Sequence, residues 1–493
     1  MRVKQIHPRD NVAVALEALG AGETVRAGER EITLAEPIPR GHKFALCPLK
    51  TGDAVIKYGC VIGYASQPVI PGGWVHSHNL KTGLSGQLEY TYTPKFKPLP
   101  PANRVDTFSG YLREDGRAAT RNEIWIIPTV GCVCDCAASL ATRNQDLVTG
   151  SIDGLYAFSH PYGCSQTNAD HARTRKLLCS LARHPNAGAV LVVGLGCENL
   201  THEQFLRELG PYDPNRIMFL TCQEVEDEMA AGRALLEKLA AFAARYQRQS
   251  VPVSKLVVGL KCGGSDGLSG ITANPTVGAF SDQLIREGGS TILTEVPEMF
   301  GAERMLMDRC VTKEVFDRTV AMVNGFKEYF LRHGEAVSDN PSPGNREGGI
   351  TTLEDKSCGC IQKGGTAPVV DVLDYGDGVR TNGLNLLYGP GNDLVSSTAL
   401  AASGAHMVIF TTGRGTPFGC PVPTVKVSSN AELPQRKKNW IDFDASVVLR
   451  GASLREAGEE LYRKVLSVAG GEQTSTERAG FRQIAIFKDG VTR

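Results

Sequence analysis

Four cysteines each follow a predicted strand by a few residues, within a turn that contains glycine: Cys132, Cys164, Cys197 and Cys262. The carboxyl ends of parallel strands all face one side of an open sheet, and ligands bind in the crevice there. Four thiols placed in this way could converge on one site, and thiolate clusters favour iron, zinc or an iron–sulfur cluster. The alternative is that each cysteine is a small apolar side chain that fills a tight turn.

Two histidines, His76 and His78, form a second candidate metal site. On an extended strand, residues i and i+2 point to the same face, so both imidazoles could bind one metal ion. A two-histidine face with open coordination positions suits a divalent Lewis acid. The alternative is a pair of surface histidines on an edge strand. Replacement of both histidines would empty the metal site under this hypothesis and leave it filled under the four-cysteine hypothesis.

Several other side chains could transfer protons or bind a carboxylate. His160 stands at the end of a predicted strand and beside a glycine turn, and Lys363 is the alternative base. Arg414 lies between two glycines, where its guanidinium could bind a carboxylate through two hydrogen bonds. Glu295 and Glu298 could be metal ligands, a base, or ordinary charges at a helix start.

Other local patterns carry less information. The glycine-rich turns at 262–270 and 412–417 match neither a Walker A motif nor GxGxxG, so they predict neither ATP nor a dinucleotide. Cys134 and Cys136 lack a matching CxxC pair for a zinc ribbon, and we expect them to be spectators. Cys358 and Cys360 form a close pair to which the sequence assigns no role.

The elements that must position these residues change in kind along the chain. Residues 1–100 contain short apolar runs punctuated by glycine and proline, and they end in an extended proline-rich segment at 93–102. Residues 101–250 and 251–493 alternate strands with helices, which predicts two α/β domains with mainly parallel sheets after a small β-rich domain. The predicted strands of the α/β part lie at 123–127, 155–159, 189–193, 256–260, 291–295, 368–372, 385–387 and 407–411.

Composition limits the functional class. The 493 residues include 53 Lys and Arg and 53 Asp and Glu, and this balance argues against a nucleic acid or an anionic membrane as the main partner. The first residues lack the apolar core of a signal peptide, and we find no apolar run long enough for a membrane helix. A cytoplasmic protein is therefore expected, in which most of the 14 cysteines would stay reduced.

Ten segments of the chain together resemble the altronate/galactarate (sugar-acid) dehydratase family. They include HSHN at 76–79 and CGGSDGLSGITANP at 262–275. The resemblance implies an N-terminal SAF (β-clip) domain, and the HSHN motif favours the altronate branch of the family. The remaining segments are residues 41–46, 56–59, 128–132, 162–166, 194–199, 294–303, 340–345 and 410–417.

The resemblance also implies a reaction, in which D-altronate loses water to give 2-dehydro-3-deoxy-D-gluconate in hexuronate catabolism. The implied cofactor is Fe(II), with Mn(II) as a substitute, and an iron–sulfur cluster is the less favoured alternative. The matching segments add His42 as a catalytic candidate, and Lys43 and Asn274 as substrate-binding candidates beside Arg414. Galactarate or another sugar acid stays an alternative substrate, as does a non-catalytic sugar-acid-binding protein. The homo-oligomeric state is left open.

This reaction makes a clear demand on the site. Dehydration of a 2,3-dihydroxy acid removes the C2 proton beside a carboxylate and expels the C3 hydroxyl. The ene-diolate that results needs concentrated positive charge, which a divalent metal chelating the carboxylate and the 2-hydroxyl would supply.

Overall fold

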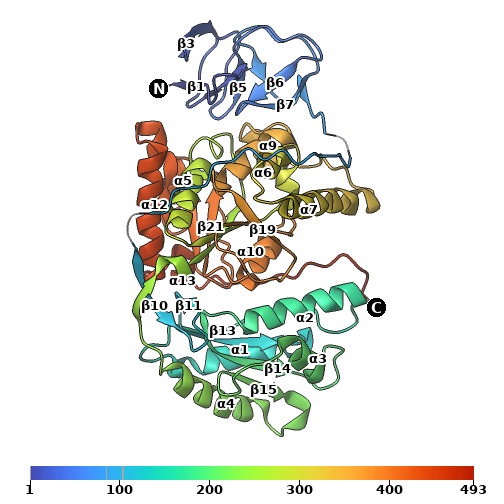
Figure 1. Cartoon of the computed structure of the whole chain (residues 1–493), viewed down its shortest axis with the longest axis vertical. Coiled ribbons are helices and arrows are strands. Elements are labelled where there is room, and N and C mark those ends of the chain that lie inside the picture. The colour runs from blue at the N-terminus through green and yellow to red at the C-terminus, as the bar shows by residue number, and fades with distance from the viewer. Residues whose placement is uncertain (1, 85, 103–104, 493) are drawn as a thin grey trace.

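Three structural units follow one another along the chain, but their order in space is different. The computed structural model describes residues 2–84, 86–102 and 105–492. In Figure 1, a small N-terminal module lies at one end, and the unit formed by the last part of the chain lies in the middle. The unit built from residues 105–252 lies at the far end. Residues 86–102 run in extended form along the central unit, where Ala102 N–H donates to Arg286 O at 2.9 Å.

The N-terminal module consists of short antiparallel strands joined by tight turns. One of these turns requires glycine at Gly72, where φ is +78° and a Cβ atom would lie 2.2 Å from Thr33 O. Two small apolar cores fill the module. Its strands are β1 (Val3–Lys4), β2 (Val12–Ala15), β3 (Thr24–Ala27), β4 (Arg30–Thr33), β5 (Lys43–Ala45), β6 (Ala54–Lys57), β7 (Cys60–Ala65), β8 (Trp74–Val75) and β9 (Leu80–Lys81).

The unit at the far end contains a four-stranded, fully parallel sheet in the order β13-β12-β14-β15. Strand β12 is buried throughout, because helices cover both faces of the sheet. A small antiparallel sheet, β11-β10-β16, joins the start of the unit to its end. The elements are β10 (Thr107–Leu112), β11 (Ala118–Ala119), β12 (Glu123–Pro128), η1 (Gly131–Val133), α1 (Cys134–Arg143), η2 (Gln145–Leu147), β13 (Gly154–Ala157), α2 (Asn168–Ala182), β14 (Ala187–Gly194), α3 (His202–Leu209), β15 (Ile217–Thr221), η3 (Cys222–Glu224), α4 (Glu228–Ala243) and β16 (Gln249–Pro252).

The central unit is built on a seven-stranded parallel sheet in the order β19-β20-β18-β17-β21-β22-β23. Its strands are β17 (Val257–Cys262), β18 (Ser290–Leu293), β19 (Val369–Leu373), β20 (Leu384–Leu387), β21 (Met407–Thr412), β22 (Thr424–Ser428) and β23 (Phe443–Asp444). Its helices are η4 (Val253–Lys255), α5 (Ala273–Arg286), η5 (Val296–Met299), α6 (Glu303–Met307), α7 (Lys313–Arg332), α8 (Pro343–Glu347), α9 (Leu353–Cys360), η6 (Ile361–Gly364), α10 (Asp393–Ala402), α11 (Glu432–Arg436), η7 (Ala445–Arg450), α12 (Leu454–Ala469) and α13 (Ser475–Arg478).

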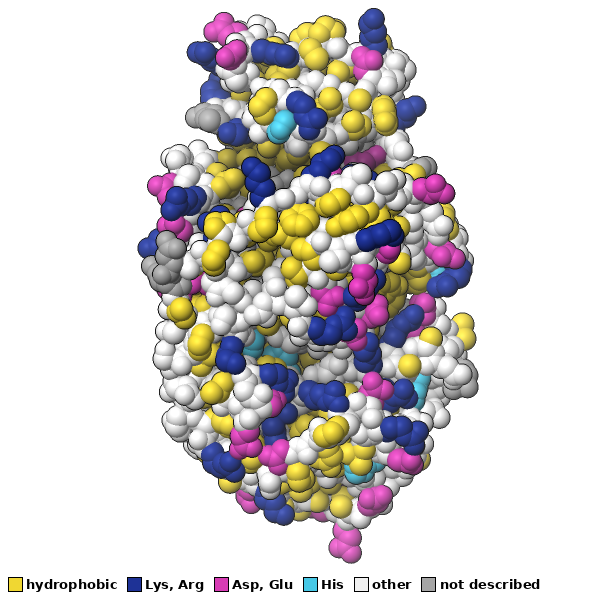
Figure 2. Space-filling model, in the orientation of Figure 1, with side chains coloured by type: hydrophobic (Ala, Val, Ile, Leu, Met, Phe, Trp, Pro, Cys, Tyr) yellow, Lys and Arg dark blue, Asp and Glu magenta, His cyan; other side chains and the backbone are white. Residues whose placement is uncertain are grey.

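The two α/β units share an apolar core. Helix α10 of the central unit packs against α2, and their side chains belong to one buried cluster with Trp125 and Phe410. The predicted fold class, a small β-rich domain followed by α/β structure with parallel sheets, is confirmed. No helix among the described residues is long and apolar enough to span a membrane. On the face in Figure 2, positive and negative side chains are interspersed, as the balanced composition predicts.

Candidate active site

The carboxyl edge of the central sheet gathers most of the buried charged residues that could do chemistry. In the sheet, β18 lies on one side of β17 and β21 lies on the other. The strand order therefore changes direction next to β17, which makes this position the topological switch point. In parallel α/β sheets, this point leaves a crevice at the carboxyl ends of the strands. Cys262 is the last residue of β17, and Glu295 and Glu298 follow β18.

Cys262, Glu298 and Cys360 form a compact group at this edge. The Sγ atoms of Cys262 and Cys360 are 3.4 Å apart, and each lies 3.0 Å from Oε2 of Glu298. Cys360 is the last residue of helix α9. All three side chains are buried.

Three lysines surround this group. Lys356 Nζ lies 2.7 Å from Glu298, and Lys363 Nζ lies 3.8 Å from Glu295. Lys261 pairs with Glu295 and, at 2.9 Å, with Asp393. Three ammonium groups therefore face three carboxylates.

These charges change the titration of their neighbours. Burial by itself would lower the pKa of Lys363, but the facing thiols and carboxylates raise that pKa above its usual value. Burial also opposes ionisation of Glu298, yet Lys356 and the other two lysines hold its pKa well below the usual range. Lys363 is therefore an ammonium group at neutral pH, which makes it a source of positive charge rather than the base expected from the sequence.

A cavity of about 790 Å³ opens directly onto this group. Asp393 lines its wall with 35% of its side chain exposed, and Lys356 and Arg346 line it with positive charge. Glu295, just behind the wall, has φ of +68°, a strained conformation for a residue with a side chain. The other lining residues are Cys262, Gly263, Gly264, Pro297, Glu298, Phe330, Glu335, Ala336, Val337, Asp339, Asn340, Pro341, Ser342, Pro343, Asn345, Leu353 and Gly391.

The donor set at this edge fits a divalent metal ion. Two sulfur atoms and one carboxylate oxygen, 3.0–3.4 Å apart, have the mutual spacing of atoms that share one ion at about 2.0–2.3 Å. We searched the described residues for three His, Cys, Asp or Glu side chains whose ligand atoms all lie within 4.8 Å of one another. Cys262, Glu298 and Cys360 are the group that meets this criterion. With both thiols protonated, the surrounding charges cancel. Release of both thiol protons would add the two negative charges that a divalent cation balances.

The four cysteines proposed as one metal site do not come together. Cys262 belongs to the central sheet, whereas Cys132, Cys164 and Cys197 follow strands of the sheet at the far end of the molecule. Cys262 is buried and the other three are exposed. Each of the four cysteines does lie at or after the carboxyl end of a strand, but these strands belong to two separate sheets.

His76 and His78 lie in a turn and not on an extended strand. The Asn79 side chain closes this turn by accepting from His76 N–H at 2.9 Å. His76 is neutral because burial lowers its pKa, and both ring nitrogens are engaged. Nε2–H donates to Arg346 O at 3.0 Å, and Nδ1 accepts from Ser77 at 3.0 Å. His76 thus has no free lone pair in this arrangement for a metal ion.

His42, the catalytic candidate of the N-terminal module, has a related role. Its Nδ1 accepts from the Trp74 indole at 3.2 Å, so Nε2 carries the proton and donates to Glu347 O at 3.1 Å. Burial lowers the pKa of His42 to about 4, which keeps the ring neutral. His42 and His76 therefore hold consecutive carbonyls at the end of α8, the helix that carries Arg346 to the cavity wall.

Lys43 and Asn274, expected to bind substrate, are committed to the fold. Lys43 and Lys57 of the N-terminal module both bind the Asp355 carboxylate of α9, at 2.9 and 3.0 Å, and all three side chains are buried. Asn274 donates to Gly359 O at 3.0 Å and accepts from Thr411 at 2.6 Å. Both residues fix α9, and neither lines the cavity.

Replacement of Asp355 by alanine should destabilise the protein by about 3–5 kcal/mol, because two buried ammonium groups would lose their counter-charge. The shift of the denaturant midpoint measures this effect. Asp317, exposed and paired with Lys313 at 2.6 Å, is the matched control, for which alanine should cost less than about 1 kcal/mol. Similar shifts for the two variants would contradict a buried counter-ion role for Asp355.

The remaining two candidates lie outside the cavity. His160 belongs to the far-end unit, where Nε2–H donates to Pro128 O at 2.8 Å and Nδ1 accepts from Tyr162 N–H at 3.2 Å. Burial lowers its pKa, so His160 is a neutral structural residue and not the base. Arg414 is half-exposed and binds Glu347 at 3.0 Å and Gly344 O at 3.1 Å beside the cavity.

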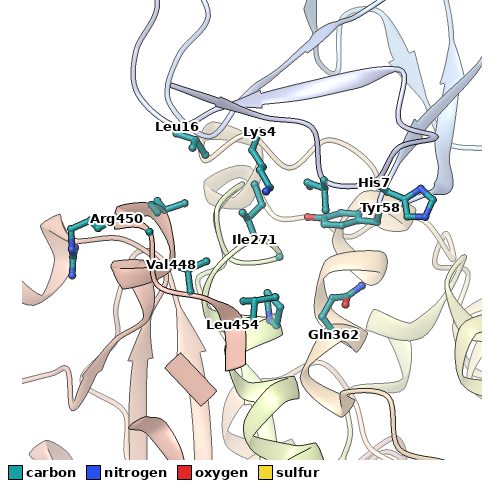
Figure 3. Close-up of a pocket in the computed structure, with 14 residues that line it drawn as sticks. Lys4, His7, Leu16, Tyr58, Ile271, Gln362, Val448, Arg450 and Leu454 are labelled. Atoms are coloured by element: carbon teal, nitrogen blue, oxygen red, sulfur yellow. The ribbon is translucent and has the colours of Figure 1, made fainter. Parts of the chain in front are cut away.

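A second cavity, of about 710 Å³, lies between the N-terminal module and the central unit. Figure 3 shows aliphatic side chains such as Leu16, Ile271 and Leu454 around it. Its charged side chains, Lys4 and Arg450 among them, come from different walls and do not converge. The cavity at the sheet edge is therefore the candidate active site.

Sequence reasoning gave no role to three of the most important residues. Lys356 and Asp393 belong to no recognisable motif, and Cys360 stands out only as one member of a close pair. The signal in the sequence was that possible metal ligands occur close together in short segments. Cys358 and Cys360 are two residues apart, and two glutamates stand at 295 and 298. Only the packing of α9 over the end of β17 shows which of these side chains meet.

Comparisons with known proteins agree with this architecture. A family model described as altronate/galactarate dehydratase SAF domain matches residues 1–83, and one described as D-galactarate dehydratase/altronate hydrolase, second domain, matches residues 110–244. A third, D-galactarate/altronate dehydratase, C-terminal, matches residues 253–492. An altronate dehydratase of Escherichia coli (strain K12) is 50% identical over 494 residues, covering 100% of both chains.

Two further relatives point the same way. An altronate dehydratase of Bacillus subtilis (strain 168) is 50% identical over 492 residues, covering 99% of both chains. A galactarate dehydratase (L-threo-forming) of Escherichia coli (strain K12) is 34% identical over 508 residues, covering 98% of this chain and 96% of its own. The chain is thus a dehydratase, an enzyme of the hydro-lyase class. It belongs to the altronate/galactarate dehydratase family, as the motifs predicted.

Proposed function

We propose that this enzyme dehydrates D-altronate to 2-dehydro-3-deoxy-D-gluconate in the cavity at the carboxyl edge of the central sheet. The observation that carries this proposal is the buried group of Cys262, Glu298 and Cys360 beside a cavity whose lining includes the cationic side chains of Arg346 and Lys356. The two altronate dehydratases that match over full length support the choice of substrate. Such a reaction belongs to hexuronate catabolism.

The cavity wall offers the charge that a sugar-acid carboxylate needs. Arg346 lines the cavity from α8, and Lys356 lines it from α9. Lys356 also donates to Asn340 at 3.0 Å, which fixes the position of its ammonium group. In this proposal Arg346 binds the carboxylate through its guanidinium fork, and Lys356 adds positive charge beside it.

Cys262, Glu298 and Cys360 are proposed to hold a divalent cation, Fe(II) with Mn(II) as a substitute. A cation held there would supply concentrated positive charge at the carboxyl end of the substrate. A soft donor set with two thiolates favours Fe(II) over Mn(II).

Asp393 is proposed as the base that removes the C2 proton. Its carboxylate is partly exposed to the cavity, and the ion pair with Lys261 fixes its position. The Asp393 carboxylate fits in this position because residue 263 is glycine. A Cβ atom at Gly263 would lie within 2.8 Å of the carboxylate oxygens. A carboxylate that is oriented and still accessible meets the geometric requirement for general-base catalysis.

The direct test is turnover. The enzyme, purified without oxygen and supplied with Fe(II) and a thiol reductant, should convert D-altronate to a 2-oxo acid at a higher kcat/KM than galactarate. Faster conversion of galactarate would transfer the proposal to that substrate. Absence of 2-oxo acid from every sugar acid tested would reject the proposed reaction.

Replacement of both His76 and His78 by alanine should leave the metal content unchanged, because these histidines do not belong to the proposed metal group. We expect KM to rise about 10-fold, since the carbonyl of Arg346 would lose its hydrogen bond from His76. Elemental analysis and steady-state kinetics measure the two effects. Loss of the bound metal in this variant would instead support the histidine site.

A further inference from the structure

Three exposed thiols, which the proposed reaction does not use, share one edge of the far-end sheet. Cys132, Cys164 and Cys197 follow β12, β13 and β14, which are adjacent in the sheet. All other cysteines of the chain are buried or half-buried. Exposed free thiols oxidise readily, so three of them on adjacent loops call for an explanation.

The loops that carry these cysteines are tied to one another. Gly131 N–H donates to Tyr162 O at 2.9 Å, which joins the first loop to the second. Leu200 N–H donates to Gly163 O at 3.0 Å, and the Asn199 side chain accepts from Ser165 N–H at 2.8 Å. These bonds join the second loop to the third, so the three thiols lie on one connected surface.

A glycine precedes each of the three cysteines, and the packing requires it at two of them. Gly163 has φ of +99°, and a Cβ atom there would lie 1.9 Å from Thr129 O. Gly196 has φ of +122°. His160 also links two of these segments. One ring nitrogen donates to Pro128 O at the end of β12, and the other accepts from Tyr162 N–H in the second loop.

The electrostatics of this edge favour an anionic group. Helices α1, α2 and α3 each begin directly after one of the three loops, so their positive ends meet there. The Gln223 amide donates to Cys197 Sγ at 3.6 Å. The nearby Glu198 carboxylate turns away, since it accepts from Gly196 N–H at 2.7 Å and from Thr129 at 2.6 Å.

The three sulfur atoms do not form a single-ion site. Of the described side chains, those with three ligand atoms within 4.8 Å of one another are Cys262, Glu298 and Cys360, so the three exposed sulfur atoms are too far apart for one ion. An iron–sulfur cluster spreads its cysteine ligands over different iron atoms and therefore over longer distances. We propose that Cys132, Cys164 and Cys197 bind a cubane iron–sulfur cluster whose fourth iron is left to a water molecule or another oxygen ligand.

The test is reconstitution of the full-length enzyme with ferrous and ferric iron and sulfide in the absence of oxygen. We expect about four iron and four acid-labile sulfide per chain beyond the divalent ion, and a broad absorption in the visible. The variant C132S/C164S/C197S should lose all the sulfide. The control C47S/C136S/C222S, which changes three half-buried cysteines, should keep it.

Two further measurements keep the result clear. Alkylation followed by mass spectrometry should find the three thiols protected after reconstitution of the unmodified enzyme, so the test does not depend on the folding of a triple variant. E298Q should keep the sulfide while it loses the active-site ion, which separates this cluster from the proposed function. Reconstituted protein without sulfide, equal sulfide in the triple variant and in the control, or unprotected thiols would each overturn the proposal.

Discussion

Replacement of Glu298 by glutamine is expected to remove the bound divalent ion and to lower kcat by about 10³-fold or more. Glu298 Oε2 lies 3.0 Å from both Cys262 Sγ and Cys360 Sγ, so it is the atom that completes the donor set. Glutamine keeps the shape of the side chain but loses the negative charge. The ion pair with Lys356 is lost as well, which leaves a buried ammonium group without its carboxylate.

Metal content by elemental analysis and 2-oxo acid formation are the two measurements for this variant. Glu303 provides the control, because it is also a buried glutamate paired with a lysine, Lys327, at 2.8 Å. It lies outside the cavity lining, so E303Q should keep the metal and most of the turnover per folded protein. An E298Q enzyme with full metal content and unchanged kcat would show that the reaction takes place elsewhere.

The second large effect is expected for Asp393. Its replacement by asparagine should lower kcat by about 10²–10⁴-fold, the usual contribution of a general base, while KM changes little. Asparagine preserves the size of the side chain beside Gly263 but cannot accept the C2 proton. The bound metal should stay, because Asp393 is not part of the group of Cys262, Glu298 and Cys360.

Exchange of the substrate C2 proton with deuterated solvent separates this role from a structural one. In D393N the exchange should slow in step with product formation, since both depend on the same proton removal. D227N, at the start of α4, changes a helix-start aspartate away from the cavity and should leave both rates unchanged. Unaltered exchange in D393N would assign the base to another group.

Many strands of the α/β part were predictable from the sequence, because strands that are buried on both faces appear as short, continuous runs of apolar residues. The eight strands predicted in the α/β part correspond to β12, β13, β14, β17, β18, β19, β20 and β21, with ends that differ by a few residues. Strands β15, β22 and β23 of the parallel sheets were not predicted, and in β22 Lys426 interrupts the apolar run. In the structure that lysine is buried, and its ammonium group donates to Thr416 O at 2.8 Å.

The roles of individual histidines and lysines were less predictable. A sequence shows that His42, His76 and His160 have proton-transfer chemistry, but not whether their ring nitrogens are already used. In the structure backbone groups occupy both ring nitrogens of His160, and His42 and His76 each donate to a carbonyl of α8. Lys43 likewise forms an ion pair with Asp355, which is 312 residues away along the chain.

The sequence by itself determined the family, the strand–turn–helix alternation and the placement of cysteines at strand ends, because each of these is written in local residue order. Only the tertiary structure decided which strand ends share a sheet. It separated Cys262 from the other three strand-end cysteines and joined it to Glu298 and Cys360, which come from a later turn and a distant helix. The physical reason is that strand pairing and helix packing bring together side chains whose separation along the chain carries no record of their distance in space.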